Sequence, residues 1–170
     1  MTTLWTFQGA DVADALKSSR FVPSWEFVPA NWEVAYRLMS DKLAEKLGHA
    51  IESPPVWCWH SCGNPGIGPT VQTALSLFGS SISQVERVTI RLDVPDDYMV
   101  LSSYFCWCEI LNLVIEGTPV EQDSLSEMLS EPLMSPEGDD VQAVLPYIDP
   151  RWVVAICPLV TANRSTHLPV

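Results

Sequence analysis

The chain has 170 residues, 47% hydrophobic and 18% charged, a composition typical of one globular domain rather than of a disordered chain. Nine Lys and Arg residues against 21 Asp and Glu residues leave a formal net charge of −12, which argues against binding of nucleic acid because phosphate recognition needs clustered cations. We expect a single domain over residues 1–170, with an acidic, loop-rich segment at 118–140 and a short tail at 159–170.

The composition also bears on the compartment. No stretch reaches the roughly eighteen uninterrupted apolar residues of a membrane span, and the first residues lack the basic and apolar regions of a secretory signal. Five cysteines without a framework spacing fit a reducing environment. We therefore expect a cytoplasmic protein that does not associate with membranes, and its seven Trp residues predict a core built on aromatic side chains.

The first part of the chain predicts one short strand and two helices, of which the second is long and amphipathic. A short strand over residues 4–7 leads into a short helix over 11–19, and an extended connector with several prolines follows. The helix over 32–47 is the clearest element, because its apolar residues recur at intervals of three and four. Asn31 can cap its start and Gly48 can end it.

The middle of the chain predicts strands joined by turns. A strand over residues 56–60 follows two prolines and precedes a loop over 63–69, while the conformation of 70–79 stays open. The alternation of apolar and polar residues over 85–94 predicts the most regular strand. A turn at 95–97 leads to a further strand over 98–101.

The last third predicts a nearly all-apolar, buried helix that begins after Ser102 or Ser103 and ends at Gly117. A short helix near residues 140–146 and a strand over 152–157 complete the domain. The fold class predicted from this order is α+β: a mixed or antiparallel sheet with two main helices packed against it.

Sulfur and imidazole groups alternate along the strand that begins at Val56. Cys58, His60 and Cys62 would share one face of a straight strand, and two thiols with an imidazole are suitable zinc ligands. Side chains two apart on such a strand are separated by roughly 7 Å, whereas structural zinc sites take closely spaced pairs from turns. The pattern favours a buried strand over a metal site, and we expect no metal and no cofactor.

A few polar residues in apolar surroundings are candidates for chemistry. Glu109 lies in a segment predicted to be buried, with Asn112 on the same side of the helix, and a buried carboxyl group with a raised pKa can act as a general acid or base. His60 is the second weak catalytic candidate. The alternative is that Glu109 and Asn112 lie on the one solvent-facing stripe of that helix.

Charge is distributed unevenly along the chain. Thirteen of the 21 carboxylates and none of the nine Lys and Arg residues lie between Leu92 and Pro150. Such a run can dock a basic protein partner, although it can also serve only to keep a Trp-rich domain in solution. The carboxylates that we predict to form this binding surface are Glu116, Glu121, Asp123, Glu127, Glu131, Glu137, Asp139 and Asp140.

Four stretches carry a family resemblance: "LWTFQ" at 4–8, "PPVWCWH" at 54–60, "VTIRLDVPDDYMVLSSYFCWCEILN" at 88–112 and "VQAVLPYIDPRWVVAIC" at 141–157. The chain resembles a bacterial family known as domain of unknown function 3841. The resemblance implies a compact intracellular domain, and it transfers no activity and no catalytic residues.

The opening segment "LWTFQGADVADALKSSRFV" is also similar to the start of ADP-ribosyltransferase-like folds. That similarity implies a cleft that holds NAD, with Arg or His on the first strand and a later Glu. Here Thr6 and Gln8 stand on the first strand instead, which departs from the pattern. Gln8, Trp57 and Asn112 are the candidate pocket residues, and His60 and Glu109 could line the same cleft.

Two functions therefore remain open from the sequence. The leading prediction is a non-catalytic binding protein, of an inhibitor, immunity or regulatory kind, that engages a basic macromolecule through its acidic region. The alternative is an enzyme that handles NAD or another nucleotide, a transferase with an ADP-ribosyltransferase-like fold.

Overall fold

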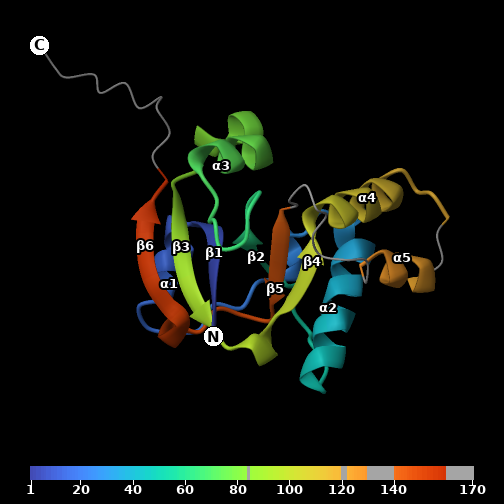
Figure 1. Cartoon of the computed structure of the whole chain (residues 1–170), viewed down its shortest axis with the longest axis horizontal. Coiled ribbons are helices and arrows are strands. Elements are labelled where there is room, and N and C mark those ends of the chain that lie inside the picture. Colours follow the sequence, from blue (N-terminus) through green and yellow to red (C-terminus); the bar gives the residue numbers. More distant parts are fainter. Residues whose placement is uncertain (84, 120–121, 130–139, 160–170) are drawn as a thin grey trace, which may run out of the picture.

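The computed structural model describes residues 1–83, 85–119, 122–129 and 140–159, and it confirms the α+β class. Six strands form one sheet in the order β4-β5-β2-β1-β3-β6, and all neighbouring pairs are antiparallel (Figure 1). The strands are β1 (Thr2–Gly9), β2 (Val56–Ser61), β3 (Arg87–Val94), β4 (Val100–Ser103), β5 (Val141–Leu145) and β6 (Val153–Pro158).

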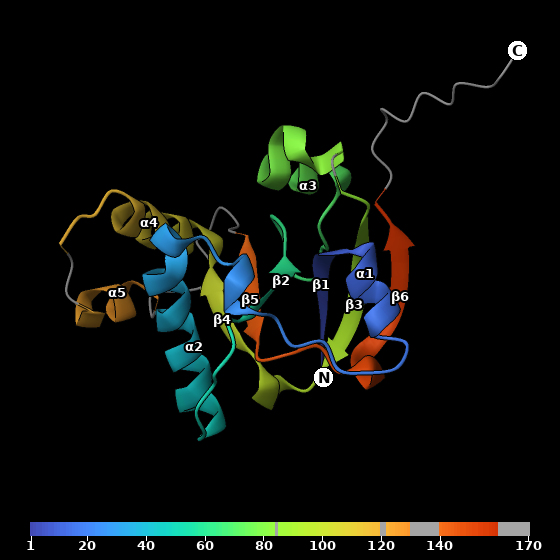
Figure 2. The ribbon, with the colours of Figure 1, turned by 180° about the vertical axis from the view of Figure 1, so that it is seen from behind.

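Helices lie on both faces of the sheet and at one end of it. In Figures 1 and 2, α1 lies against the β1 and β3 strands, α2, α4 and α5 gather beside β4, and α3 lies beyond the end of the central strands. No helix in the described ranges is long and apolar enough to cross a membrane. The helices are α1 (Ala10–Ala15), α2 (Glu33–Leu47), α3 (Val71–Phe78), α4 (Tyr104–Ile115) and α5 (Gln122–Met128), with 3-10 turns η1 (Trp25–Phe27), η2 (Ala30–Trp32), η3 (Gly79–Ser83), η4 (Asp96–Tyr98) and η5 (Pro150–Trp152).

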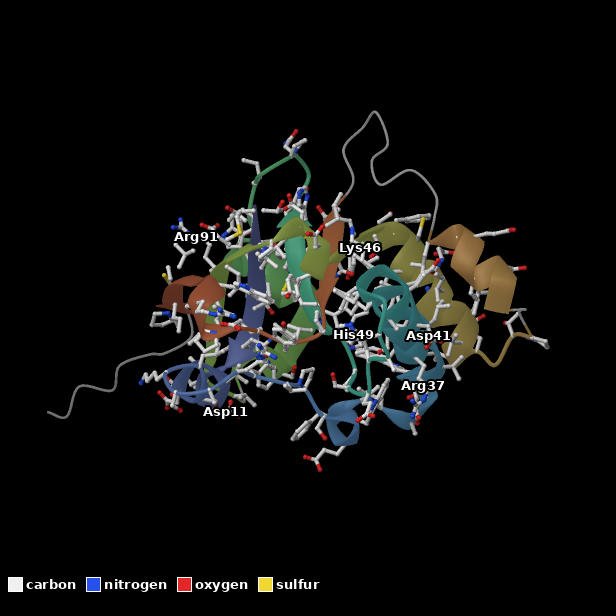
Figure 3. All side chains as sticks on the ribbon, turned by 90° about the horizontal axis from the view of Figure 1, so that it is seen from below. Asp11, Arg37, Asp41, Lys46, His49 and Arg91 are labelled. Atoms are coloured by element: carbon white, nitrogen blue, oxygen red, sulfur yellow. The ribbon has the colours of Figure 1, made fainter. Side chains whose placement is uncertain are left out.

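Two hydrophobic clusters occupy the two faces of the sheet, because successive residues of a strand point to opposite sides. On one face, residues of the central strands such as Leu4 and Ile90 pack with Val12 and Leu16 from α1 and its C-cap. On the other face, Val144 of β5 packs under α2, α4 and α5. The charged side of α2 faces outward, and Arg37 and Asp41 point away from the sheet in Figure 3.

Several predicted elements are confirmed together with their local signals. The helix over 32–47 is α2, and it ends at Gly48, whose φ of 72° is a left-handed conformation that favours glycine. Ser103 caps α4, with its side chain accepting a hydrogen bond from the Cys106 N–H. The sequence leaves the conformation of residues 70–79 open, and in the structure this segment contains α3. Thr70 caps this helix through a reciprocal pair of hydrogen bonds with Thr73.

Other boundaries differ from the prediction. The helix α1 follows the N-cap Gly9 and ends already at Ala15. Asn31 does not cap α2, because it lies within the 3-10 turn η2, and Trp32 occupies the N-cap without a side-chain capping bond. The strand predicted over 98–101 is shifted, because Tyr98 ends a 3-10 turn and β4 begins at Val100. The acidic segment expected to be loop-rich contains α5.

The prediction of a short helix near residues 140–146 was wrong, because this segment is strand β5. All five of its residues are buried, since β5 pairs with β2 on one side and β4 on the other. A strand covered on both faces has no alternation of apolar and polar residues, so its pattern cannot be distinguished from that of a buried helix.

The helix α4 is less buried than predicted. Trp107 and Ile110 are buried, whereas Phe105 is 66% exposed and Glu109 and Asn112 are also exposed. The helix therefore presents one apolar face to the sheet and one stripe to solvent. Glu109 and Asn112 therefore lie on the solvent-facing stripe of α4, which was the alternative to their burial.

A buried carboxylate joins the connector after α1 to the turn before β6. Asp149 is 5% exposed, and its oxygens accept hydrogen bonds from Arg151 at 2.8 Å and from Arg20 at 3.2 Å. The Arg20 guanidinium also lies over the Tyr147 ring, 3.7 Å from its centroid. The Arg151 side chain, above all, holds the pKa of Asp149 well below its usual range, against the opposing effect of burial.

We predict that Asp149→Asn lowers the free energy of unfolding by about 1–2 kcal/mol at pH 7, because the amide loses charge-assisted hydrogen bonds. The folded-state pKa of Asp149 is depressed, so its contribution is complete above the unfolded pKa of about 4 and is lost as the pH falls toward the folded value. Urea unfolding at pH 7 and pH 3 should show the difference narrowing in acid.

The control is Asp14→Asn, because the ion pair of Asp14 with Lys17 is exposed at both ends and is expected to contribute about 0–0.5 kcal/mol. Equal losses for the two variants, or a difference for Asp149→Asn that does not depend on pH, would contradict the assignment.

Candidate ligand-binding cleft

The cleft lies where β1 and β2 separate. β1 pairs with β3 along its whole length, from Thr2 opposite Val94 to Gly9 opposite Arg87, but it pairs with β2 only at Trp5 opposite Trp59. Beyond that pair a cavity of about 810 Å³ opens, within the range of small-molecule sites. Because the strands part here, side chains from both faces of the sheet line the cavity.

Side chains hold the parted strands in place of backbone pairing. The Thr6 hydroxyl, which is 1% exposed, donates to the Trp57 carbonyl at 2.8 Å and accepts from Gln8 Nε2 at 2.8 Å. Pro54 and Pro55 precede β2 and have no N–H, so they cannot donate ladder hydrogen bonds that would extend the pairing toward the end of β1. The local sequence therefore keeps the cleft open.

One wall of the cleft is aromatic. The rings of Trp57 from β2 and Trp107 from α4 have centroids 4.2 Å apart, and Tyr36 of α2 contacts both edge-on at 5.7 and 5.8 Å. Trp59 and Tyr104 form a further edge-on pair at 5.0 Å. Such rings provide flat, rigid surfaces on which a planar ligand can stack.

Two buried polar atoms of the lining have no hydrogen-bond partner among the described residues. Gln142 of β5 is 5% exposed, and its Oε1 is buried and unpaired. The buried indole Nε1 of Trp57 also has no hydrogen-bond partner among these residues, although it lies near enough to the Tyr36 hydroxyl to oppose the rise in the Tyr36 pKa that burial causes. A buried unpaired polar atom costs about 1–3 kcal/mol, so the lining offers one acceptor and one donor that a ligand can satisfy.

The end of the cleft near α3 carries a cation. Arg87, the first residue of β3, lies with its guanidinium 4.0 Å from the centroid of the Phe78 ring, and its Nε is buried without a partner among the described residues. Phe78 contacts Phe7 edge-on at 6.0 Å. Arg87 is the one Lys or Arg side chain, and Asp11 the one carboxylate, among the described residues that line the cavity.

The structure brings some of the predicted pocket residues together and separates others. Gln8 and Trp57 line the cleft, as does Cys58. Glu109 and Asn112 lie on the exposed stripe of α4, and His60 also lies outside the lining. The His60 Nδ1 lies 2.7 Å from the hydroxyl oxygen of Ser61, which is fully buried and so is not placed to act as a nucleophile.

The arrangement of Cys58, His60 and Cys62 differs from the expected stripe. The register of β2 shifts between Trp59 and Ser61, so the alternation breaks at His60 and Cys62 no longer follows Cys58 on one face. No group of three His, Cys, Asp or Glu side chains within the described ranges could hold a metal ion. Burial raises the pKa of Cys58 to about 12 and, with the Asp140 carboxylate adding to it, that of Cys62 to about 11.

The predicted acidic surface is described only in part. Glu116 and Glu127 are exposed. Asp140 has a partner within the chain, since its carboxylate accepts a hydrogen bond from the Gly63 N–H at 2.7 Å. Four of the remaining predicted positions lie outside the described residues: Glu121, Glu131, Glu137 and Asp139. For the fifth, Asp123, the side chain is not described.

The reasoning from sequence missed Gln142 and Arg87. Gln142 is the one polar residue in the run "VQAVL", and that polar interruption of an apolar run was the available signal. It was obscured because the segment was interpreted as a helix. Arg87 belonged to a correctly predicted strand, but its place at the cleft depends on the distant residues Phe7 and Phe78.

We predict that Cys58 resists alkylation in the folded protein, because a pKa of about 12 leaves only about one thiolate in ten thousand at pH 8. Cys157 is exposed on β6 and should be modified first. Brief iodoacetamide treatment at pH 8, followed by peptide mass spectrometry with and without urea, measures both. If Cys58 were labelled as rapidly as Cys157 in the folded protein, the buried placement would be wrong.

No family model, curated protein or solved structure matches this chain. The resemblance to the domain of unknown function 3841 family therefore stays a prediction.

Proposed function

We propose that the chain binds a small ligand of the nucleotide class in the cleft between β1 and β2. The observation that carries the proposal is the buried Oε1 of Gln142, which has no partner among the described residues and lies in the lining of a cavity with an aromatic wall. A carbonyl oxygen in this position favours a ligand with an N–H group, and the Trp57 indole favours an acceptor on the same ligand.

A planar nitrogen heterocycle meets these requirements together. Its edge carries both donors and acceptors, and its faces can stack on the half-buried rings of Trp57 or Tyr36 in the lining. Stacking of a base on an aromatic side chain contributes about 1–3 kcal/mol. A cavity of about 810 Å³ has room for a base with its sugar.

The proposal is one of binding rather than of catalysis. Among the described residues that line the cleft, Asp11 is the sole carboxylate, and the two weak catalytic candidates lie outside it. The similarity to ADP-ribosyltransferase-like folds implies Arg or His on the first strand, where this chain has Thr6 and Gln8. A nucleotide sensor or carrier accords better with this lining than a transferase does.

We predict that Gln142→Met raises the stability of the free protein by about 1 kcal/mol, because it removes an unpaired buried acceptor. The same substitution should weaken nucleoside binding at least tenfold. Calorimetric titration with adenosine, guanosine, cytidine and uridine measures the affinity, and urea unfolding measures the stability.

The matched control is Gln8→Met, in the same cleft. Its amide is already paired with Thr6, so this substitution should lower stability. If the wild-type protein bound none of the four nucleosides, or if Gln142→Met destabilised the protein as Gln8→Met does, the proposed function would be refuted.

A second candidate is docking of a basic protein on the acidic part of the chain. The specific observation is the absence of Lys and Arg from Leu92 to Pro150, a span that holds thirteen carboxylates. Within it, the exposed residues Glu116 and Glu127 lie at the end of α4 and on α5. Such a surface would accelerate and strengthen association with a cationic partner, most strongly at low salt.

For this candidate we predict that basic proteins captured from a cytosolic lysate at low salt are released by moderate salt. The double change Glu116→Gln with Glu127→Gln should weaken capture about three- to tenfold. The control, Asp41→Asn with Glu45→Gln, neutralises two exposed carboxylates of α2 outside the acidic span. Equal capture by both double variants would refute docking at this surface.

A further inference from the structure

We propose that the ligand carries an anionic oxygen group, a phosphate or a carboxylate, and that Arg87 binds this group at the α3 end of the cleft. The inference rests on the proposed function, since it assigns a second recognition point within the same site. Arg87 would determine specificity, and the expected ligands would be nucleosides that carry an acidic group.

The Arg87 guanidinium is held in place before any ligand arrives. It stacks on the Phe78 ring at 4.0 Å, and Phe78 is in turn supported by the edge of Phe7 at 6.0 Å. The planar guanidinium presents a fixed fork of donors that matches the two oxygens of a carboxylate or phosphate. Little side-chain entropy remains to be lost when an anion binds.

Within the described residues, the half-buried Arg87 has no ion-pair partner. Its Nε is buried without an acceptor, and none of the ion pairs formed by these residues includes it. Asp11, the sole carboxylate of the described lining, is not within ion-pair distance of it. A buried N–H without an acceptor costs free energy, and an anionic ligand that accepts a hydrogen bond from it would offset that cost.

The strand register separates the two recognition points. Gln142 lies opposite Trp59, which lies opposite Trp5, whereas Arg87 lies opposite Gly9 at the far end of β1. Three steps across the sheet and four residues along it place the two backbones roughly 15–20 Å apart. A ligand that satisfies both side chains has to be extended, as a nucleoside with a phosphate on its sugar is.

Arg91 provides a natural control on the same strand. It lies four residues beyond Arg87 and so points to the same face of the sheet, but it is exposed and does not line the cleft. Figure 3 shows its side chain projecting outward, on the other side of the sheet from Asp11. Removing its charge changes the net charge of the protein as removal of the Arg87 charge does.

The test compares adenosine with adenosine 5′-monophosphate and adenosine 5′-carboxylate by calorimetric titration of the wild type, Arg87→Gln and Arg91→Gln. We expect at least one of the two anions to bind the wild type about tenfold or more tightly than adenosine. Arg87→Gln should abolish this preference, so that the anion binds the variant no more tightly than adenosine does, whereas Arg91→Gln should preserve it. Tighter binding of the monophosphate would identify the anionic group as a phosphate, and tighter binding of the carboxylate would identify it as a carboxylate.

The outcomes separate the two proposals. Equal binding of adenosine and both anions to the wild type refutes the role of Arg87 and leaves the proposed function standing. No binding of any of them, together with no binding of guanosine, cytidine or uridine, refutes both. Because Arg87 packs on Phe78, Arg87→Met is included as a second variant that keeps the apolar stem, and thermal unfolding verifies that each variant is folded. Retention of the anion preference in a folded Arg87→Met variant also overturns the inference.

Discussion

The hydrogen bond from the Thr6 hydroxyl to the Trp57 carbonyl marks the point at which backbone pairing between the two central strands gives way to side chains. β1 continues along β3 to its end, while β2 turns away after a single pair with β1. A sheet that pairs throughout has no room for a ligand between its strands. Here the parting of β1 and β2 creates the cleft, and the remaining elements are arranged around it.

The two hydrophobic clusters stabilise this interrupted sheet from opposite faces. The cluster with α1 joins residues of β1, β2, β3 and β5 on one face, and the cluster under α2 and α4 covers β2, β4 and β5 on the other. The first cluster therefore holds the two parted strands, β1 and β2, together on its face. Buried atoms of Gln142, Trp57 and Arg87, which have no hydrogen-bond partner in the part of the chain that the structure describes, line the cleft. Their desolvation lowers the stability of the free protein and would favour a bound ligand.

Burial explains why the reactive side chains of β2 do not form a functional site. Cys58 and Ser61 are nearly inaccessible, and burial raises the pKa of Cys58 to about 12, so thiol or hydroxyl chemistry at β2 is disfavoured. Glu109 faces solvent because α4 has one apolar face against the sheet and one stripe outside. The direction in which a side chain points from its helix or strand therefore decides its role more than its chemical type does.

Sequence alone determined the elements with local signals. The periodicity of α2 and its end at Gly48, the alternation in β3 and the Ser103 cap of α4 all depend on residues within a few positions of one another. Tertiary structure decided the identity of β5, the burial of Gln142 and the position of Arg87. Each of these depends on strand partners or ring contacts far away along the chain, and a local pattern contains no information about such partners.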